Sequence, residues 1–218
     1  RRKPGQSKIT TQRKEKDIAR ILSGVFEGRT TGTSISVMVS NEDAKPHAYD
    51  HLKELFRPSH ADFTYEKKYG LRDWRGGGRA SARETVGRVA AGTIAKKLLL
   101  HWENIHTVVW VEQIHDIKSS VDKKTVSVMQ IEESIVRCPD SEASDAMIER
   151  IHQARKSGDS VGGIIRAVIR NVPAGLGNPV FDKLDALLAS SMMSINAVKG
   201  VEIGSGFDVI SKKGSECR

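Results

Sequence analysis

Aromatic residues and cysteines are scarce in this sequence, and long apolar runs are missing from it. Phe, Trp and Tyr make up 5% of the 218 residues, which disfavours a nucleic-acid binder that stacks bases on aromatic platforms. Cys138 and Cys217 lie in no CxxC pair, so two free thiols in a reducing cytosol are expected. No apolar stretch approaches the ~20 residues of a membrane span, and no signal peptide is visible. We therefore predict a cytoplasmic protein without membrane contact.

Metal-site and nucleotide-loop signatures are also missing. His47 and His51 have helical spacing, but no third ligand accompanies them, so no metal site is predicted. The P-loop pattern GxxxxGK[ST] does not occur, and Gly204-Ser205-Gly206 lacks the third glycine of a dinucleotide loop. No Ser/His/Asp or Cys/His triad can be assigned from the spacing.

Positive charge is in excess. The formal net charge is +8, which favours an anionic partner: nucleic acid, a phosphorylated metabolite or a phosphate-bearing cofactor. The basic N-terminal residues fit either a phosphate-binding arm or a solvated tail. They are Arg1, Arg2, Lys3 and Lys8.

Periodicity predicts a single α+β domain over residues 1–218. The expected strands are 21–26, 34–40, 105–114 and 161–169, with a last strand pair in 198–210. Residues 30–33 are expected to join the first two strands as a hairpin. The expected helices are 81–100, 141–156 and 181–195. Residues 41–78 read as a long loop whose specific residues indicate function rather than disorder.

The helix beginning near Ser81 is the clearest element. Ser81-Ala82-Arg83-Glu84 has the pattern of a capping box, in which Ser81 caps the Glu84 amide and Glu84 reaches back. Apolar residues then recur at three- and four-residue spacing and predict one buried face. They are Val86, Val89, Ala90, Ile94 and Leu98.

A basic, glycine-rich run precedes this helix. Residues 67–83 hold six Lys or Arg residues against the single acid Asp73 before Glu84, and a glycine triplet at 76–78 lets a backbone approach a ligand closely. The run ends at a helix N-terminus, where free amides favour an anion. The residues therefore fit either an anion site or a solvated basic loop.

His60 lies between Arg57 and Asp62 in the segment RPSHAD. A histidine with these neighbours is suited to give a proton beside an anionic substrate. A surface histidine in a loop is the alternative that the residues leave open.

Many segments in order resemble the chorismate synthase family, and they span nearly the whole chain. The longest are RGGGRASARET at 75–85 and SINAVKGVEIG at 194–204. The others are RRKPG at 1–5, LSGVFEG at 22–28, TTGT at 30–33, RPSHAD at 57–62, KYG at 68–70, RVAAG at 88–92, PAGLG at 173–177 and PVFD at 179–182.

The resemblance implies a fold, a reaction and a cofactor. The fold is a β-α-β sandwich of antiparallel sheets with helices between them, assembled as a homotetramer. The reaction is an anti-1,4-elimination of phosphate from 5-enolpyruvylshikimate 3-phosphate, which gives chorismate in the shikimate pathway to aromatic amino acids. Reduced FMN is required without net redox change, and NADPH is a candidate reductant for the flavin.

The resemblance also implies roles for individual residues. His60 matches a catalytic histidine thought to protonate the reduced flavin. Arg57 and Arg83 match substrate-binding arginines, and Arg2 and Lys8 match a basic pair near substrate and cofactor. Lysine at position 8, where the family often has arginine, puts a bidentate contact there in question. The flavin-binding matches are Arg79, Ala80, Ser81, Asn196 and Ala197.

Two family segments match nothing in residues 1–218. A GESHG segment with a second catalytic histidine is expected before Arg1, and a KPTS-like flavin segment with a late Asp after Arg218. The 218 residues alone are therefore expected to be inactive. The competing interpretations are a basic RNA- or DNA-binding module, which no recognised motif supports, and a catalytically inactive scaffold fragment.

Overall fold

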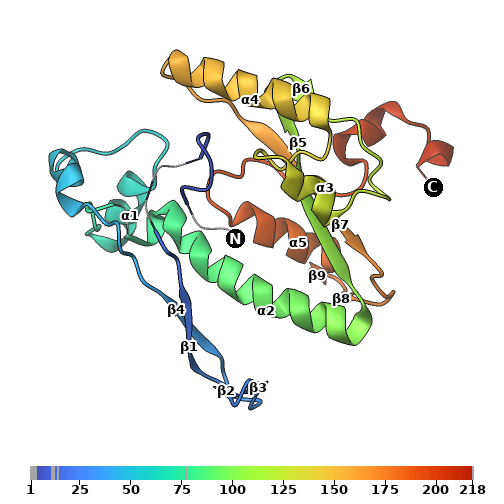
Figure 1. Ribbon diagram of the computed structural model, residues 1–218, viewed down its shortest axis with the longest axis horizontal. Helices are drawn as coiled ribbons and strands as arrows, with labels where there is room; N and C mark the ends of the chain where they lie inside the picture. Colours follow the sequence, from blue (N-terminus) through green and yellow to red (C-terminus); the bar gives the residue numbers. More distant parts are fainter. Residues whose placement is uncertain (1–3, 11–12, 14, 77, 218) are drawn as a thin grey trace.

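The computed structural model describes residues 4–10, 13, 15–76 and 78–217. The α+β prediction with antiparallel sheets is confirmed, because helices and strands are mixed and each strand pairing of the described residues is antiparallel. A hairpin projects from one side of a long central helix, and a three-stranded sheet with two helices lies on the other (Figure 1).

The hairpin occupies the first part of the chain. Its strands are β1 (Ala19–Ser23), β2 (Val25–Phe26), β3 (Arg29–Thr30) and β4 (Ser36–Val39). β1 pairs with β4, which confirms the predicted hairpin, but the turn at its tip lies at residues 27–28, between the paired strands β2 and β3, rather than at 30–33. Gly24 has a φ of 80°, and a Cβ there would lie 2.7 Å from the Ser34 carbonyl oxygen. Only glycine fits this bend without strain.

The stretch expected to be a long loop contains regular structure. It holds the 3-10 helix η1 (Pro46–Leu52), helix α1 (Asp62–Tyr69) and the 3-10 turn η2 (Gly78–Ala80). Helix α1 ends at Gly70, which has the left-handed φ of 72° that is common after a helix C-terminus. The loop prediction was therefore wrong for 62–69, whose sequence lacks an apolar stripe.

The long central helix is α2 (Thr85–Glu103), which follows the short 3-10 turn η3 (Ala82–Glu84). It ends at Asn104, whose φ of 52° is left-handed. Helix α2 leads directly into β5, so it sets the position of the sheet relative to the hairpin (Figure 1).

The main core surrounds the three-stranded sheet. Strand β5 (His106–Ile114) pairs with β6 (Ile117–Lys118) and β7 (Gly163–Arg170), and α3 (Val128–Glu133) and α4 (Ser141–Lys156) pack against the sheet. Asp140 caps α4 by accepting from the Ala143 amide at 3.1 Å. One core cluster contains Val108, Trp110, Val126 and Ile131, and the other contains Val136, Cys138, Ala143 and Met147.

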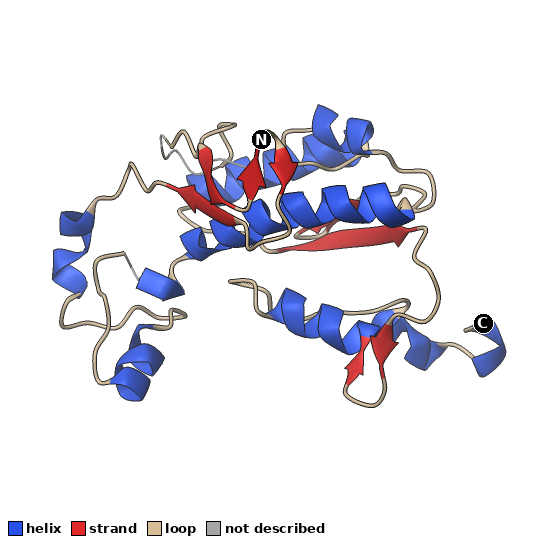
Figure 2. Cartoon of the chain, turned by 90° about the horizontal axis from the view of Figure 1, so that it is seen from below, coloured by secondary structure: helices blue, strands red, loops and turns tan. Residues whose placement is uncertain are grey.

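The C-terminal third holds β8 (Gly177–Asn178), β9 (Asp182–Lys183), α5 (Leu184–Met193) and the 3-10 turns η4 (Gly206–Ser211) and η5 (Gly214–Glu216). Helix α5 and its two short strands lie together, apart from the main sheet (Figure 2). The last strand pair predicted in 198–210 is wrong: the described residues contain no strand there. Exposed Ile203 and Ile210 have no neighbouring strand, and a strand needs one for its backbone hydrogen bonds.

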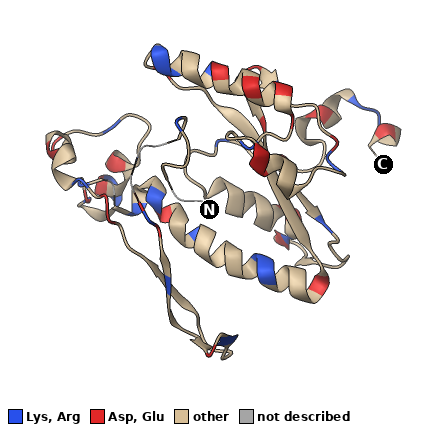
Figure 3. Ribbon diagram, in the orientation of Figure 1, with Lys and Arg blue, Asp and Glu red and all other residues tan. Residues whose placement is uncertain are grey.

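Much apolar surface stays uncovered in these 218 residues. The buried face predicted for α2 is wrong, because the helix has no buried residue and Val89 and Leu98 are exposed. The accessible surface is 16531 Å², against about 9,900 Å² for a compact monomer of this mass. Charged residues gather around α1 and the start of α2, while the middle of α2 is mostly uncharged (Figure 3). Such apolar faces mark contact surfaces for further protein.

Among the described residues, no helix has the length and apolar character for a membrane crossing.

Candidate active site

Arg57 and Asp62 form a buried ion pair at the start of α1. Asp62 is the first residue of that helix, and its side chain is 3% exposed. Arg57 donates from Nε to Oδ2 at 2.8 Å and from Nη2 to Oδ1 at 3.0 Å, and its backbone amide donates to Oδ2 at 3.2 Å. The Arg57 side-chain hydrogen bonds hold the pKa of Asp62 well below its ordinary value, although burial opposes this shift. The same contact raises the pKa of Arg57, so both groups are charged at neutral pH.

His60 lies against this ion pair. Its Nδ1 is 2.9 Å from Asp62 Oδ1 and 3.2 Å from Arg57 Nη2. The turn that brings the ring back to Asp62 passes through Ser59, which has a left-handed φ of 59°. The predicted neighbours of His60 therefore touch it, and the ring is half-buried rather than free on the surface.

Arg72 lies next to Asp62 and binds the neighbouring backbone. Its guanidinium donates to Glu66 and to the carbonyl oxygens of Leu52, Lys53 and Leu55. Its Nη1 is buried without a hydrogen-bond partner and lies 4.0 Å from Asp62 Oδ1. Arg72 therefore ties the 52–55 backbone to the start of α1.

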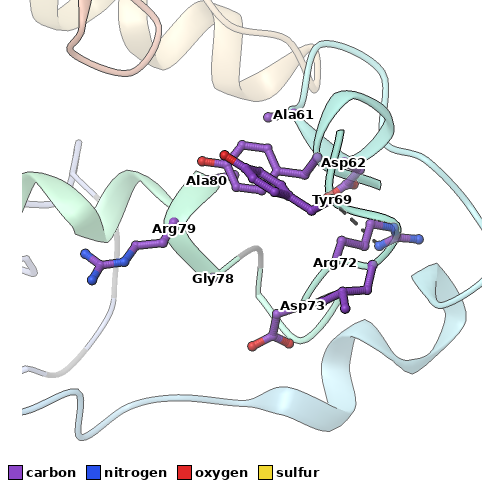
Figure 4. Close-up of a pocket in the computed structure, with 10 residues that line it drawn as sticks. Ala61, Asp62, Tyr69, Arg72, Asp73, Gly78, Arg79 and Ala80 are labelled. Carbon is purple, nitrogen blue, oxygen red and sulfur yellow. Dashed lines mark ion pairs between the residues drawn. The ribbon is translucent and has the colours of Figure 1, made fainter. Parts of the chain in front are cut away.

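A cavity of about 280 Å³ lies between α1 and the turn before α2. Its wall combines two tyrosines with charged groups, and the dashed line in Figure 4 marks the ion pair between Asp62 and Arg72 in that wall. The Arg79 side chain extends away from the other labelled groups (Figure 4) and pairs with Glu84 at 2.6 Å. The lining residues are Ala61, Asp62, Tyr65, Tyr69, Leu71, Arg72, Asp73, Gly78, Arg79 and Ala80.

The start of α2 is capped differently from the prediction. The Ser81 hydroxyl accepts from the Arg83 amide at 3.3 Å and caps η3 rather than α2. Glu84 does not reach back to Ser81, because its carboxylate binds Arg79. The expected capping box is therefore wrong, although Ser81 does cap the turn that opens this helix.

Arg83 reaches back to the base of the hairpin. Its Nη2 donates to Asp17 at 2.8 Å and to the Ser40 carbonyl oxygen at 2.8 Å, and it lies 3.7 Å from the buried Glu15. The guanidinium is therefore already neutralised by carboxylates of the chain. To bind Arg83, an anionic ligand therefore has to displace the carboxylate of Asp17.

A segment more than 100 residues downstream joins the start of α2. The Asn196 side-chain amide donates to the Ala80 carbonyl oxygen at 3.4 Å. Arg88 donates to the Ser194 hydroxyl at 2.9 Å and to the Ser194 carbonyl oxygen at 3.1 Å. Segments 79–81 and 196–197, both predicted to bind a flavin, thus lie side by side.

The family model described as chorismate synthase matches residues 1–218. The chain belongs to the chorismate synthase family. Among curated relatives, the chorismate synthase of Nostoc punctiforme is 58% identical over 207 residues, which are 95% of this chain and 57% of that protein. The chorismate synthase of Trichodesmium erythraeum is 56% identical over 216 residues, which are 99% of this chain and 58% of that protein.

A solved structure titled "Crystal Structure of Chorismate Synthase" matches with a TM-score of 0.69 and 31% identity. The match covers 92% of this chain and 60% of that one, and it confirms the predicted chorismate synthase fold. The chain thus spans 57–60% of the length of these chorismate synthases.

The residues that match site residues of the family are not all in contact with one another. Arg57 and His60 are in direct contact, and Ala80 contacts Asn196. Lys8 is exposed, and its carbonyl oxygen accepts from Arg155 on α4. Its partner in the predicted basic pair, Arg2, lies outside the described residues, so that pair remains a prediction.

Three contributors were not predicted as site residues: Asp62, Arg72 and Arg88. The sequence carried a signal for the first, since Asp62 stands two residues after His60 in a tight turn. Arg72 belonged to the basic run, but its role as a backbone tie depends on carbonyl oxygens that sequence alone cannot place. The Arg88 contact to Ser194 joins residues 106 positions apart.

Proposed function

We propose that this chain carries part of the active site for the chorismate synthase reaction. That reaction is the reduced-FMN-dependent anti-1,4-elimination of phosphate from 5-enolpyruvylshikimate 3-phosphate to chorismate. The observation that supports it best is the meeting of Arg57, His60 and Asp62 in a protein of this family. Together they place a histidine beside a fixed guanidinium, as a reaction on an anionic substrate needs.

Arg57 and Arg83 are proposed to bind the anionic substrate, with Arg2 and Lys8 nearby. Arginine forks suit carboxylate and phosphate oxygens, and the substrate carries one phosphate and two carboxylates. Both described guanidiniums lie against carboxylates of the chain, Asp62 and Asp17. These acids hold each arginine in place before the substrate arrives.

The residues at the start of α2 are proposed to bind reduced FMN. Arg79, Ala80 and Ser81 offer a cation, backbone groups and a hydroxyl, and Asn196 and Ala197 lie beside them through the Asn196–Ala80 hydrogen bond. This donor set fits a flavin nucleotide, because Arg79 is 80% exposed and its partner Glu84 is 42% exposed, so a phosphate can replace that carboxylate. Reduced FMN would supply an electron transiently to the substrate as phosphate leaves, and NADPH is the candidate source of the flavin's reduction.

His60 is proposed to be a proton donor at this site. Its ring is 23% exposed, which leaves one edge open to a ligand while Arg57 and Asp62 fix the other. The positive charge of Arg57 attracts an anion to the same place, so proton transfer and substrate binding share one corner of the site.

The test is His60→Ala in a protein that contains this chain and the remaining length of its relatives. Turnover with supplied reduced FMN should fall by ~100- to 10,000-fold, with a far smaller change in substrate affinity. The control is His47→Ala, since that side chain is 98% exposed. Unchanged turnover, with affinity alone reduced, would make His60 a binding residue.

The assembly and location are proposed with the function. The family's homotetramer would cover apolar faces such as that of α2, which the 218 residues leave exposed. A cytoplasmic location fits the phosphorylated substrate. Native mass spectrometry of the protein tests the tetramer directly.

A further inference from the structure

Arg83 is anchored where the backbone pairing of the hairpin has already stopped. Strands β1 and β4 pair as far as Ala19 opposite Val39. Beyond that pair, Asp17 lies on one side of the open end and Ser40 on the other, and Arg83 Nη2 donates to both. The position of Arg83 therefore depends on how the two sides of the open end are held together.

Glu15 joins the two sides with a side chain that is 0% exposed. Its Oε2 accepts from the backbone amide of Glu42, on the opposite side, at 3.1 Å. Its Oε1 accepts from Arg13 Nη2. The same nitrogen crosses the open end and donates to Asn41 Oδ1 at 2.9 Å and to the Asp43 carbonyl oxygen at 3.0 Å. Arg13 and Glu15 thus form a clasp across the base of the hairpin.

Two acids face Arg83, and they differ in their other partners. Asp17 Oδ1 is 2.8 Å from Arg83 Nη2, and this acid is 13% exposed. Glu15 Oε2 is 3.7 Å from the same nitrogen, which is an ion-pair distance rather than a hydrogen bond. The oxygens of Glu15 are already taken by the clasp, and a buried carboxylate that lost these partners would be unfavourable. Glu15 is therefore the acid that stays in place.

We propose that Glu15 is a positioning residue for Arg83. It closes the open end of the hairpin and keeps a buried negative charge beside the guanidinium, so Arg83 stays in place when a ligand anion displaces Asp17. The clasp is seen in the structure without a ligand, whereas the binding of a ligand at Arg83 rests on the proposed function.

Two substitutions of Glu15 separate position from charge. Glu15→Asp keeps the charge but is one methylene shorter, so its carboxylate cannot reach Arg13 and the Glu42 amide together. Glu15→Gln keeps the length but removes the charge and places an NH2 group against groups that only donate. Both should loosen Arg83, although only Glu15→Gln makes the surroundings more positive. The matched control is Glu132→Asp on α3, because Glu132 Oε2 also lies 3.7 Å from an arginine, Arg137.

The first measurement is the binding of inorganic phosphate to the 218-residue chain by calorimetry. Each Glu15 variant should weaken binding about 5-fold, and the control should not change it. In an Arg83→Gln background, the same variants should have less than about a 1.5-fold effect, because Glu15 acts through Arg83. Stronger binding by Glu15→Gln would show that Glu15 only competes with the ligand, and would overturn the proposal. Equal losses with and without Arg83 would also overturn it.

The clasp is also tested without a variant. In hydrogen exchange of the wild type, the Glu42 amide should be protected both without ligand and with saturating phosphate, because Glu15 accepts from it. A Glu42 amide that exchanges freely in either state would overturn the proposal, so poor folding of a Glu15 variant does not remove the test.

Urea unfolding distinguishes failure of the proposal from failure of the proposed function. The effects of Glu15→Asp and Arg83→Gln on the unfolding equilibrium constant should be non-additive by about 5-fold, and additive effects would overturn the positioning. Non-additive effects, with a phosphate affinity that Arg83→Gln does not change, would uphold the positioning and refute the binding role of Arg83.

Turnover is measured in a protein with the full length of the relatives. Glu15→Asp should raise KM about 5- to 10-fold and leave kcat within about twofold, as expected when a group acts on substrate binding alone. A lower kcat at unchanged KM would indicate a general structural defect and would overturn the proposal.

Discussion

Acid should destabilise this protein through Asp62. The pKa of Asp62 is lower in the folded chain than its ordinary value, so the carboxylate adds stability at pH values above about 4, the unfolded reference. That contribution is lost as pH falls below the reference toward the folded value, at up to ~1.4 kcal/mol per pH unit. Asp62→Asn removes it at every pH.

The cost at neutral pH follows from burial. Asp62 is 3% exposed and bound by Arg57, with Arg72 also nearby. Removing one partner of a buried pair leaves an uncompensated charge, at about 3–5 kcal/mol. Because the guanidinium of Arg57 is 24% exposed, we expect the lower end, about 3 kcal/mol. For a protein of this size that is a fall in Tm of about 6–12 °C.

The assay is urea unfolding at pH 7 and at pH 3.5, for wild type, Asp62→Asn and the exposed control Asp145→Asn. The difference between wild type and Asp62→Asn should shrink at the lower pH, since the wild-type carboxylate begins to protonate in the unfolded state. Asp145→Asn should stay within about 0.5 kcal/mol of wild type. A difference below about 1 kcal/mol at pH 7, or one that does not depend on pH, would refute the reasoning.

Three further substitutions test the core and the ligand site. Met147→Ala, at a residue that is 0% exposed, should lower the free energy of unfolding by about 2–5 kcal/mol in urea titrations. Arg88→Lys should weaken reduced-FMN binding about 5- to 10-fold in anaerobic titrations, because lysine cannot hold both Ser194 oxygens at once; unchanged affinity would contradict a role for that contact. Asp17→Asn should strengthen inorganic phosphate binding several-fold in calorimetry, since it removes the carboxylate that competes for Arg83.

The sequence predicted elements best where a periodic pattern coincided with packing. The expected helix 141–156 has the same bounds as α4, whose capping Asp140 and buried Met147 lie where the pattern requires. Helix α1 was missed because its eight residues carry no apolar stripe. A signal was nevertheless present: Lys67 and Lys68 followed by Gly70 are typical of a helix C-terminus.

The errors in burial have a different origin. The sequence of α2 does carry an apolar face, but Val89 and Leu98 on it stay exposed in the described part of the chain. Periodicity predicts which face a helix would bury, but it does not predict which segment or protein covers that face. The site could be predicted where its residues are close in sequence, as in 57–62. It could not be predicted where Arg88 meets Ser194 across more than 100 residues.

Three arginines of the proposed site are each paired with an acid of the chain. Arg57 is held by Asp62, Arg79 by Glu84 and Arg83 by Asp17. A carboxylate beside each guanidinium neutralises its charge and fixes its position. The three pairs differ in exposure, and this decides which can exchange. Asp62 is buried and also holds His60, so Arg57 is expected to keep its acid and offer only its remaining edge. Glu84 is 42% exposed, and its pair is the easiest to open. Ligand anions should therefore displace Glu84 readily, Asp17 at greater cost, and Asp62 not at all.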